Sequence, residues 1–109
     1  MQRKLPAEVI DTVRRLEKGL NKNKIDVEAI YIFGSYVRGD YIETSDIDVV
    51  VVSDSWKNIP FLKRMDILNE IIWKERIRKV EAIPVTKEEL NRKDSILLKD
   101  ASKYWIRLR

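Results

Sequence analysis

Apolar residues recur along the chain with two different periods, one typical of helices and one typical of strands. Between Pro6 and Leu20 they return every three or four residues, which predicts a helix that begins near Pro6. A second stripe with the same period follows Pro60 and predicts another helix. Its apolar face would carry Phe61, Met65, Leu68 and Ile72.

Three denser apolar runs, at residues 28–33, 46–52 and 79–85, predict strands. The first run ends at Gly34 and is apolar on both faces, so we expect it to lie centrally in a sheet. The third contains Pro84, which lacks a backbone donor and favours an edge strand or a strand end.

The C-terminal part of the chain predicts further helices. Thr86 followed by Glu89 fits a capping box, and Asp94 or Ser95 would cap a last helix. The apolar face of that last helix would carry Leu97, Ala101, Tyr104, Trp105 and Leu108. The order of the elements predicts an α/β (α+β) fold, in which helices pack against a small mixed sheet.

Composition narrows the possible chemistry. The chain has 109 residues, which predicts a single domain over residues 1–109. It contains no Cys and no His, so a bound metal would need carboxylate ligands, and these favour Mg²⁺ or Mn²⁺. The net charge of +4 is spread along the chain, which favours a solvated surface over a nucleic-acid face. With no apolar run near 18 residues, we expect a soluble cytoplasmic protein without a membrane segment.

The three tryptophans, Trp56, Trp73 and Trp105, are expected to be core residues or half-buried anchors. The alternative is an exposed aromatic patch, which would mark a surface for a partner.

The pattern with the most specific chemistry is Gly34-Ser35, ten residues, then Asp46-Ile47-Asp48. On a strand, Asp46 and Asp48 would point to the same face, about 6.5–7 Å apart. Two neighbouring carboxylates repel unless a cation lies between them or one takes a proton. Mg²⁺ commonly binds one or two carboxylates together with substrate phosphates. The alternative is a polar strand start, with one Asp capping a turn and the other solvated.

Three more residues suit phosphate binding. Gly34 allows backbone amides to approach a phosphate, and Ser35 adds a hydroxyl. Arg38 adds a planar set of donors that matches phosphate oxygens. Arg38 could instead form a surface pair with Asp40 or Glu43, and Ser35 could be a plain turn hydroxyl.

The motifs Gly34-Ser35-Tyr36-Val37-Arg38-Gly39-Asp40 and Ser45-Asp46-Ile47-Asp48 resemble those of the minimal nucleotidyltransferases, the smallest members of the DNA polymerase beta superfamily. The resemblance implies the nucleotidyltransferase fold, ATP or another nucleoside triphosphate as donor, and catalytic metal ligands at Asp46 and Asp48. It also implies a third carboxylate on a later strand, which would be Glu81. The usual residue there is Asp, so the alternative is that Glu81 is an exposed residue of an edge strand.

The same resemblance implies a partner. Minimal nucleotidyltransferases are often encoded beside a small helical HEPN-family toxin, and such an antitoxin places AMP on a tyrosine of the toxin. Two other functions stay open: a module that masks a toxin without chemistry, and a transferase acting on RNA 3′ ends. The sequence leaves the acceptor, the base preference and the oligomeric state open.

Overall fold

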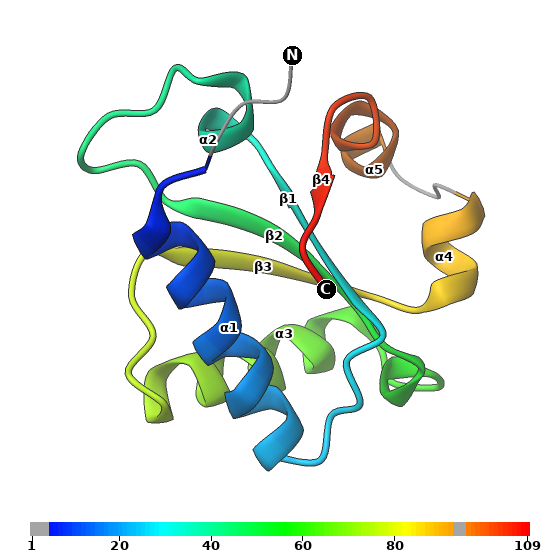
Figure 1. Ribbon diagram of the computed structural model, residues 1–109. Coiled ribbons are helices and arrows are strands. Elements are labelled where there is room, and N and C mark those ends of the chain that lie inside the picture. The colour runs from blue at the N-terminus through cyan, green and yellow to red at the C-terminus, as the bar shows by residue number, and fades with distance from the viewer. Residues whose placement is uncertain (1–4, 93–95) are drawn as a thin grey trace.

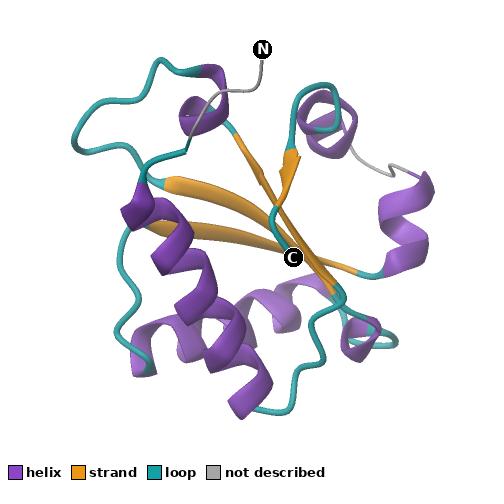
Figure 2. Ribbon diagram, viewed as in Figure 1, coloured by secondary structure: helices purple, strands orange, loops and turns teal. Residues whose placement is uncertain are grey.

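A four-stranded sheet in the order β3-β2-β1-β4 organises the computed structural model, which describes residues 5–92 and 96–109 (Figures 1 and 2). β1 is antiparallel to both of its neighbours, while β2 and β3 run parallel. β1 is therefore central and β3, which contains Pro84, lies at an edge, as predicted. The strands are β1 (Ala29–Phe33), β2 (Ile47–Val52), β3 (Val80–Val85) and β4 (Ile106–Arg107).

The helices cover the two faces of this sheet, which confirms the predicted α/β class (Figure 2). They are α1 (Ala7–Lys22), α2 (Ser35–Arg38), α3 (Phe61–Lys74), α4 (Lys87–Arg92) and α5 (Ile96–Ala101), with a 3-10 turn at Asp54–Trp56. α1 and α3 pack on one face, and residues of α4 and α5 pack on the other. In the described part of the chain, no helix has the length and apolar content needed to cross a membrane.

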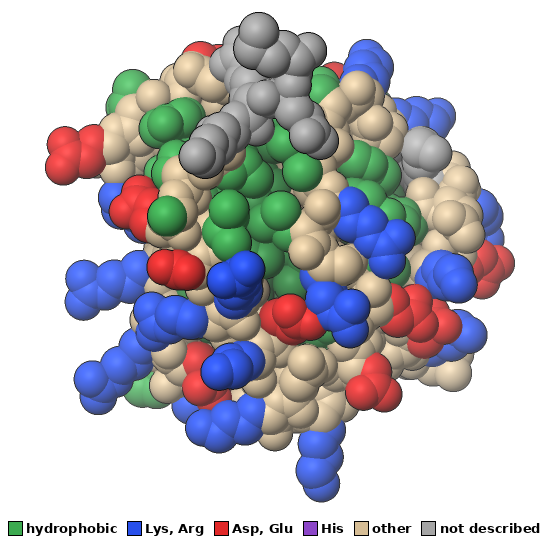
Figure 3. Space-filling model, in the orientation of Figure 1, with side chains coloured by type: hydrophobic (Ala, Val, Ile, Leu, Met, Phe, Trp, Pro, Cys, Tyr) green, Lys and Arg blue, Asp and Glu red, His purple; other side chains and the backbone are tan. Residues whose placement is uncertain are grey.

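The larger core lies between the sheet and the two long helices. The predicted stripe of α1 is buried, and Trp56 is fully buried in the same core. Figure 3 shows hydrophobic side chains gathered between α1 and β4. Half-buried residues that pack against this core include Ile10, Tyr104, Ile106 and Leu108.

The buried face of α3 differs from the predicted one. Its buried residues are Arg64, Leu68 and Ile71, whereas Phe61 is 49% exposed and Trp73 is 82% exposed. The prediction of Trp73 as an anchor is therefore wrong. Burial of Arg64 is tolerated because its guanidinium donates to the Ile59 carbonyl (2.8 Å) and to the Glu89 carboxylate (2.6 Å).

The predicted last helix is wrong beyond Ala101. There α5 ends, and the Ala101 carbonyl accepts a hydrogen bond from the Trp105 amide (3.0 Å). The chain then extends along the open edge of β1, where Arg107 pairs with Tyr31. The apolar spacing could not distinguish a helix from a turn followed by a strand. The strand is favoured because it gives hydrogen-bond partners to backbone groups of β1 that would otherwise be unpaired.

The capping box of α4 is confirmed. The Glu89 amide donates to Thr86 Oγ1 (3.2 Å), and the Thr86 amide donates to Glu89 Oε1 (2.8 Å). The caps predicted at Asp94 or Ser95 lie outside the described residues.

Candidate functional site

Two carboxylates meet where β2 and β3 begin. Asp48 is the register partner of Glu81 in the parallel pair and of Phe33 in β1. Because side chains alternate along a strand, both carboxylates project on the face that also holds Val50 and Ile83. The pKa of Asp48 is raised from 3.8 to about 6, mainly by burial and then by the charge of Glu81 and a side-chain hydrogen bond with it. The pair therefore favours a shared proton or a bound cation.

Gly34 brings the backbone directly against Asp48. It lies between β1 and α2 with φ 79° and ψ −153°, a conformation open in practice only to glycine. A Cβ built on Gly34 would collide with Oδ2 of Asp48. Both the backbone conformation and the space beside the carboxylate therefore require glycine at this position.

Ser35 begins α2, so the predicted helical turn after Gly34 is present. It is half-buried, and its carbonyl accepts from the Gly39 amide (2.8 Å). Gly39 ends the helix in the left-handed conformation, with φ 90°. The short turn holds the Ser35 hydroxyl at the end of β1, which is the end that faces Asp48.

Arg38 forms the surface pair that the sequence left open as an alternative. Its Nε lies 3.3 Å from Oδ2 of Asp40, and its Nη1 donates to the Tyr104 hydroxyl (3.4 Å). Its positive charge also acts on Asp48, where it opposes the rise in pKa. Arg38 is exposed and near the carboxylates, and it has protein partners in this arrangement.

Asp46 is exposed and lies one residue before β2. The prediction that it belongs to the strand is therefore wrong. Its charge adds to the rise in the pKa of Asp48. The loop before it is closed by Ser45, whose Oγ accepts from the Ile42 amide (2.9 Å). Lys79 Nζ also donates to the Glu43 carbonyl of this loop (2.6 Å).

The donor atoms at this end of the sheet suit a hard divalent cation. They are carboxylate oxygens without competing imidazole or thiolate, and Asp48 already faces a second acid. Over residues 5–92 and 96–109, however, no three acidic, His or Cys side chains converge closely enough to hold a metal as they stand. Asp46 and Glu81 are the exposed members of the predicted set, so their side chains would have to move toward the half-buried Asp48.

Sequence reasoning missed two aromatic contacts at this site. Tyr104 was expected on a helix, yet its hydroxyl accepts from Arg38. Tyr36 is buried and stacks on Tyr41, with ring centroids 4.3 Å apart. Burial raises the pKa of Tyr36, and nearby acids including Glu8 and Asp46 raise it further. No sequence motif signals these contacts, because they join segments through the fold.

Comparison with known proteins is consistent with this geometry. The profile of the nucleotidyltransferase domain family matches residues 13–104. Two similar proteins from Methanocaldococcus jannaschii are named protein adenylyltransferases. One is 40% identical over 63 residues, which are 58% of this chain and 61% of that protein. The other is 34% identical over 82 residues, which are 75% of this chain and 79% of that protein.

Solved structures share the fold. A crystal structure described as a nucleotidyltransferase from Sulfolobus solfataricus is 29% identical, with a TM-score of 0.61 over 78% of this chain and 73% of that one. A crystal structure described as a toxin–antitoxin with AMP-PNP is 23% identical, with a TM-score of 0.59 over 88% of this chain and 71% of that one. The second likeness concerns the fold alone.

Proposed function

The chain belongs to the nucleotidyltransferase domain family, and we propose that it transfers AMP from ATP to a hydroxyl group of another protein. The observation that supports this most is the Asp48 carboxylate, which lies between the Gly34 backbone and Glu81. An acid with a raised pKa beside a second acid is typical of a catalytic or metal-binding site.

Each residue near this carboxylate has a role in the proposal. Ser35 and the amides that follow Gly34 bind the outer phosphates of the nucleotide, and Arg38 turns from Asp40 to the same phosphates. Asp46, Asp48 and Glu81 would hold Mg²⁺ or Mn²⁺. When bound, this cation neutralises phosphate charge and stabilises the leaving oxygen.

The reaction is an in-line displacement at phosphorus. The acceptor oxygen attacks the α-phosphorus, a new P–O bond forms, and the bond to pyrophosphate breaks. The proton of the acceptor hydroxyl moves to a carboxylate of the Asp48–Glu81 pair, because the raised pKa of Asp48 lies closer to neutral pH and suits a general base. Positioning and charge neutralisation supply most of the rate.

The acceptor in this proposal is a tyrosine of a HEPN-family toxin, so the chain would act as an antitoxin in the cytoplasm, where ATP is available. Two findings support a protein acceptor and a toxin partner, whereas the tyrosine and the HEPN family come from the resemblance of the motifs. Relatives are named protein adenylyltransferases, and the fold is shared with a protein described as a toxin–antitoxin.

The test is intact-mass spectrometry of the product of the neighbouring gene after incubation with this chain, ATP and Mg²⁺. We expect the partner to gain one or more AMP units. Asp48→Asn should slow the gain by at least about a hundredfold, the scale for loss of one charge-stabilising group. Asp66→Asn is the matched control, because Asp66 is exposed on α3, away from Asp48. A partner that stays unmodified while forming a tight complex with the chain contradicts the proposal.

A second candidate is a module that masks its partner without chemistry. It is favoured by the exposure of Glu81 and by the carboxylates that do not converge among the described residues. Glu81→Ala separates the two functions. If transfer is correct, the parent adds AMP and this variant loses that gain while keeping the complex. If masking is correct, neither protein adds AMP and both form the complex.

A further inference from the structure

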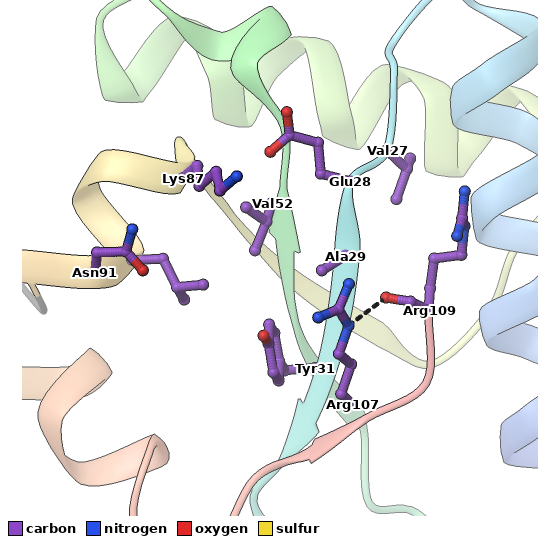
Figure 4. A pocket seen from close by; sticks show the side chains of 10 residues that line it. Val27, Glu28, Ala29, Tyr31, Val52, Lys87, Asn91, Arg107 and Arg109 are labelled. Carbon is purple, nitrogen blue, oxygen red and sulfur yellow. Dashed lines mark hydrogen bonds between the residues drawn. The ribbon is translucent and has the colours of Figure 1, made fainter.

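A pocket opens at the end of the sheet that lies away from Asp48. Its volume is about 460 Å³, within the range of small-molecule sites. Figure 4 shows Ala29 and Val52 on its floor, with Lys87 and Arg107 directed into it from opposite sides. Val52 is four residues beyond Asp48 on β2, so the pocket lies about 13 Å from the carboxylates.

The arginine side of the pocket is held by aromatic contacts. The Arg107 guanidinium lies over the Tyr31 ring, 5.9 Å from its centroid. Trp105 packs against Tyr31 with ring centroids 4.5 Å apart. Nε of Arg107 donates to the Arg109 carbonyl (2.9 Å). The hydrogen bond uses Nε of the guanidinium, and Figure 4 shows the Arg107 side chain directed into the pocket.

The helix on the lysine side of the pocket is held by a part-buried ion pair. Lys87 is the first residue of α4, whose capping acid Glu89 bonds to the buried Arg64 (2.6 Å). The same helix contributes Leu90 and Asn91 to the lining. The two cationic walls therefore come from elements that are fixed independently of any ligand.

The lining suits a ligand with an anionic end and a polar body. Among the described residues, the lining holds three cations, Lys87, Arg107 and Arg109, and one acid, Glu28. Arg109 pairs with Glu17, which leaves Lys87 and Arg107 for the ligand. A phosphate monoester carries about two negative charges and suits these two cations. Glu28 can accept hydrogen bonds from a sugar or base, and Asn91 can both accept and donate them.

We propose that this pocket binds a nucleoside monophosphate, separately from the carboxylate site. Its phosphate lies between Lys87 and Arg107, and its base stacks on the guanidinium over the apolar floor. The described residues that line the pocket include no acid pair comparable to Asp48 and Glu81, so its role is binding without transfer. The inference does not depend on the proposed AMP transfer.

The test is a titration of the ¹⁵N-labelled protein with AMP, followed by NMR in EDTA so that no divalent cation is bound. At millimolar AMP we expect shifts of the amides of Ala29, Val52 and Asn91. Lys87→Gln and Arg107→Gln should each weaken binding about tenfold or more, the scale for one charge-assisted hydrogen bond. Lys87→Gln is the safer variant, because Arg107 also contacts Tyr31 and the Arg109 carbonyl.

Two control variants and two other ligands complete the design. Lys63→Gln removes an exposed lysine of α3, on the other side of the sheet, and Asp48→Asn alters only the carboxylate site; both should leave AMP binding unchanged. Absence of binding overturns the proposal, as does binding that Asp48→Asn abolishes. Equal shifts with inorganic phosphate, or stronger ones with a glutamate-rich peptide, overturn the assignment to a nucleotide.

Discussion

The two ends of one sheet face hold opposite charges and are built in opposite ways. At the Asp48 end, register alone brings two acids together, and the Gly34 backbone closes over one of them. At the Lys87 end, cations reach in from α4 and β4, which are distant in sequence, and are held by packing and hydrogen bonds. The strands between the two ends are apolar.

The residues proposed to carry the chemistry and the residues that mainly stabilise the fold therefore lie at different ends of this sheet face. The acidic end holds like charges, which destabilise the fold unless a cation or a proton compensates, and a backbone conformation that only glycine adopts without strain. The basic end is stabilised by the Arg64–Glu89 pair and the Arg107–Tyr31 contact. We therefore expect changes at the acidic end to alter chemistry as well as stability, and changes around Arg64 to alter stability with little effect on chemistry.

The largest effect is expected from Gly34→Ala, which would break the acidic end. The alanine must adopt a positive φ, and its Cβ must displace the Asp48 carboxylate. We expect a loss of about 3 kcal/mol in the free energy of unfolding, together with loss of nucleotidyl transfer. Urea denaturation and the intact-mass assay measure the two effects.

Gly39→Ala is the matched control for this change. Gly39 also has a positive φ, but it lies at the exposed end of α2. Its substitution should cost about 1 kcal/mol and leave transfer intact. Equal losses in the two variants would show that backbone conformation alone, and not contact with Asp48, explains the requirement for Gly34.

A smaller effect is expected from Glu89→Gln, which weakens the support of the basic end. The substitution leaves the buried Arg64 guanidinium without its charged partner, so the free energy of unfolding should fall by about 2 kcal/mol. Burial alone would raise the pKa of Glu89, but hydrogen bonds from Arg64 and Thr86 lower it overall. The contribution of the ion pair is therefore present at neutral pH and lost as the pH falls through this lowered pKa.

Glu88→Gln on the same helix provides the control, because Glu88 pairs with Arg92 at an exposed position. Its effect should stay below about 0.5 kcal/mol. Urea denaturation of both variants at neutral pH measures the difference. A transfer rate reduced by Glu89→Gln in protein that is still folded would contradict the separation of the two ends.

The smallest effect is the pH dependence of stability at Asp48, measured without metal. The folded state raises the pKa of this carboxyl to about 6, so it holds the proton more tightly than the unfolded chain does. This contribution to stability is present below about pH 4 and is lost as the pH rises through 6. Asp48→Asn should remove this dependence and stabilise the metal-free protein at pH 7 by about 1 kcal/mol, because the site is only half-buried.

Thermal unfolding of the parent and of Asp48→Asn at pH 4.5 and pH 7.5 tests this prediction, with Asp66→Asn as the reference for an exposed acid. Parallel pH curves for the parent and Asp48→Asn would contradict the proposed coupling of Asp48 to Glu81. Added Mg²⁺ should reverse the order at pH 7.5, because the cation requires the charged parent carboxylate.

The sequence by itself determined the elements whose signals are local. The period of α1, the glycine that ends β1, the Thr86–Glu89 capping box and the Pro84 edge strand all follow from contacts within a few residues. The spacing of Gly34-Ser35 and Asp48 also indicated the acidic end, since both flank a turn between paired strands. The roles of these residues in transfer stay predictions.

Only the tertiary structure decided which groups from distant segments meet. The spacing of Tyr104, Trp105 and Leu108 suits a helix, but the open edge of β1 offered hydrogen bonds that turned the segment into β4. Burial of Arg64 depended in the same way on a carboxylate 25 residues later. Hydrophobic periodicity carries no information about such partners, because backbone pairing and charge compensation between segments are satisfied only once the chain has folded.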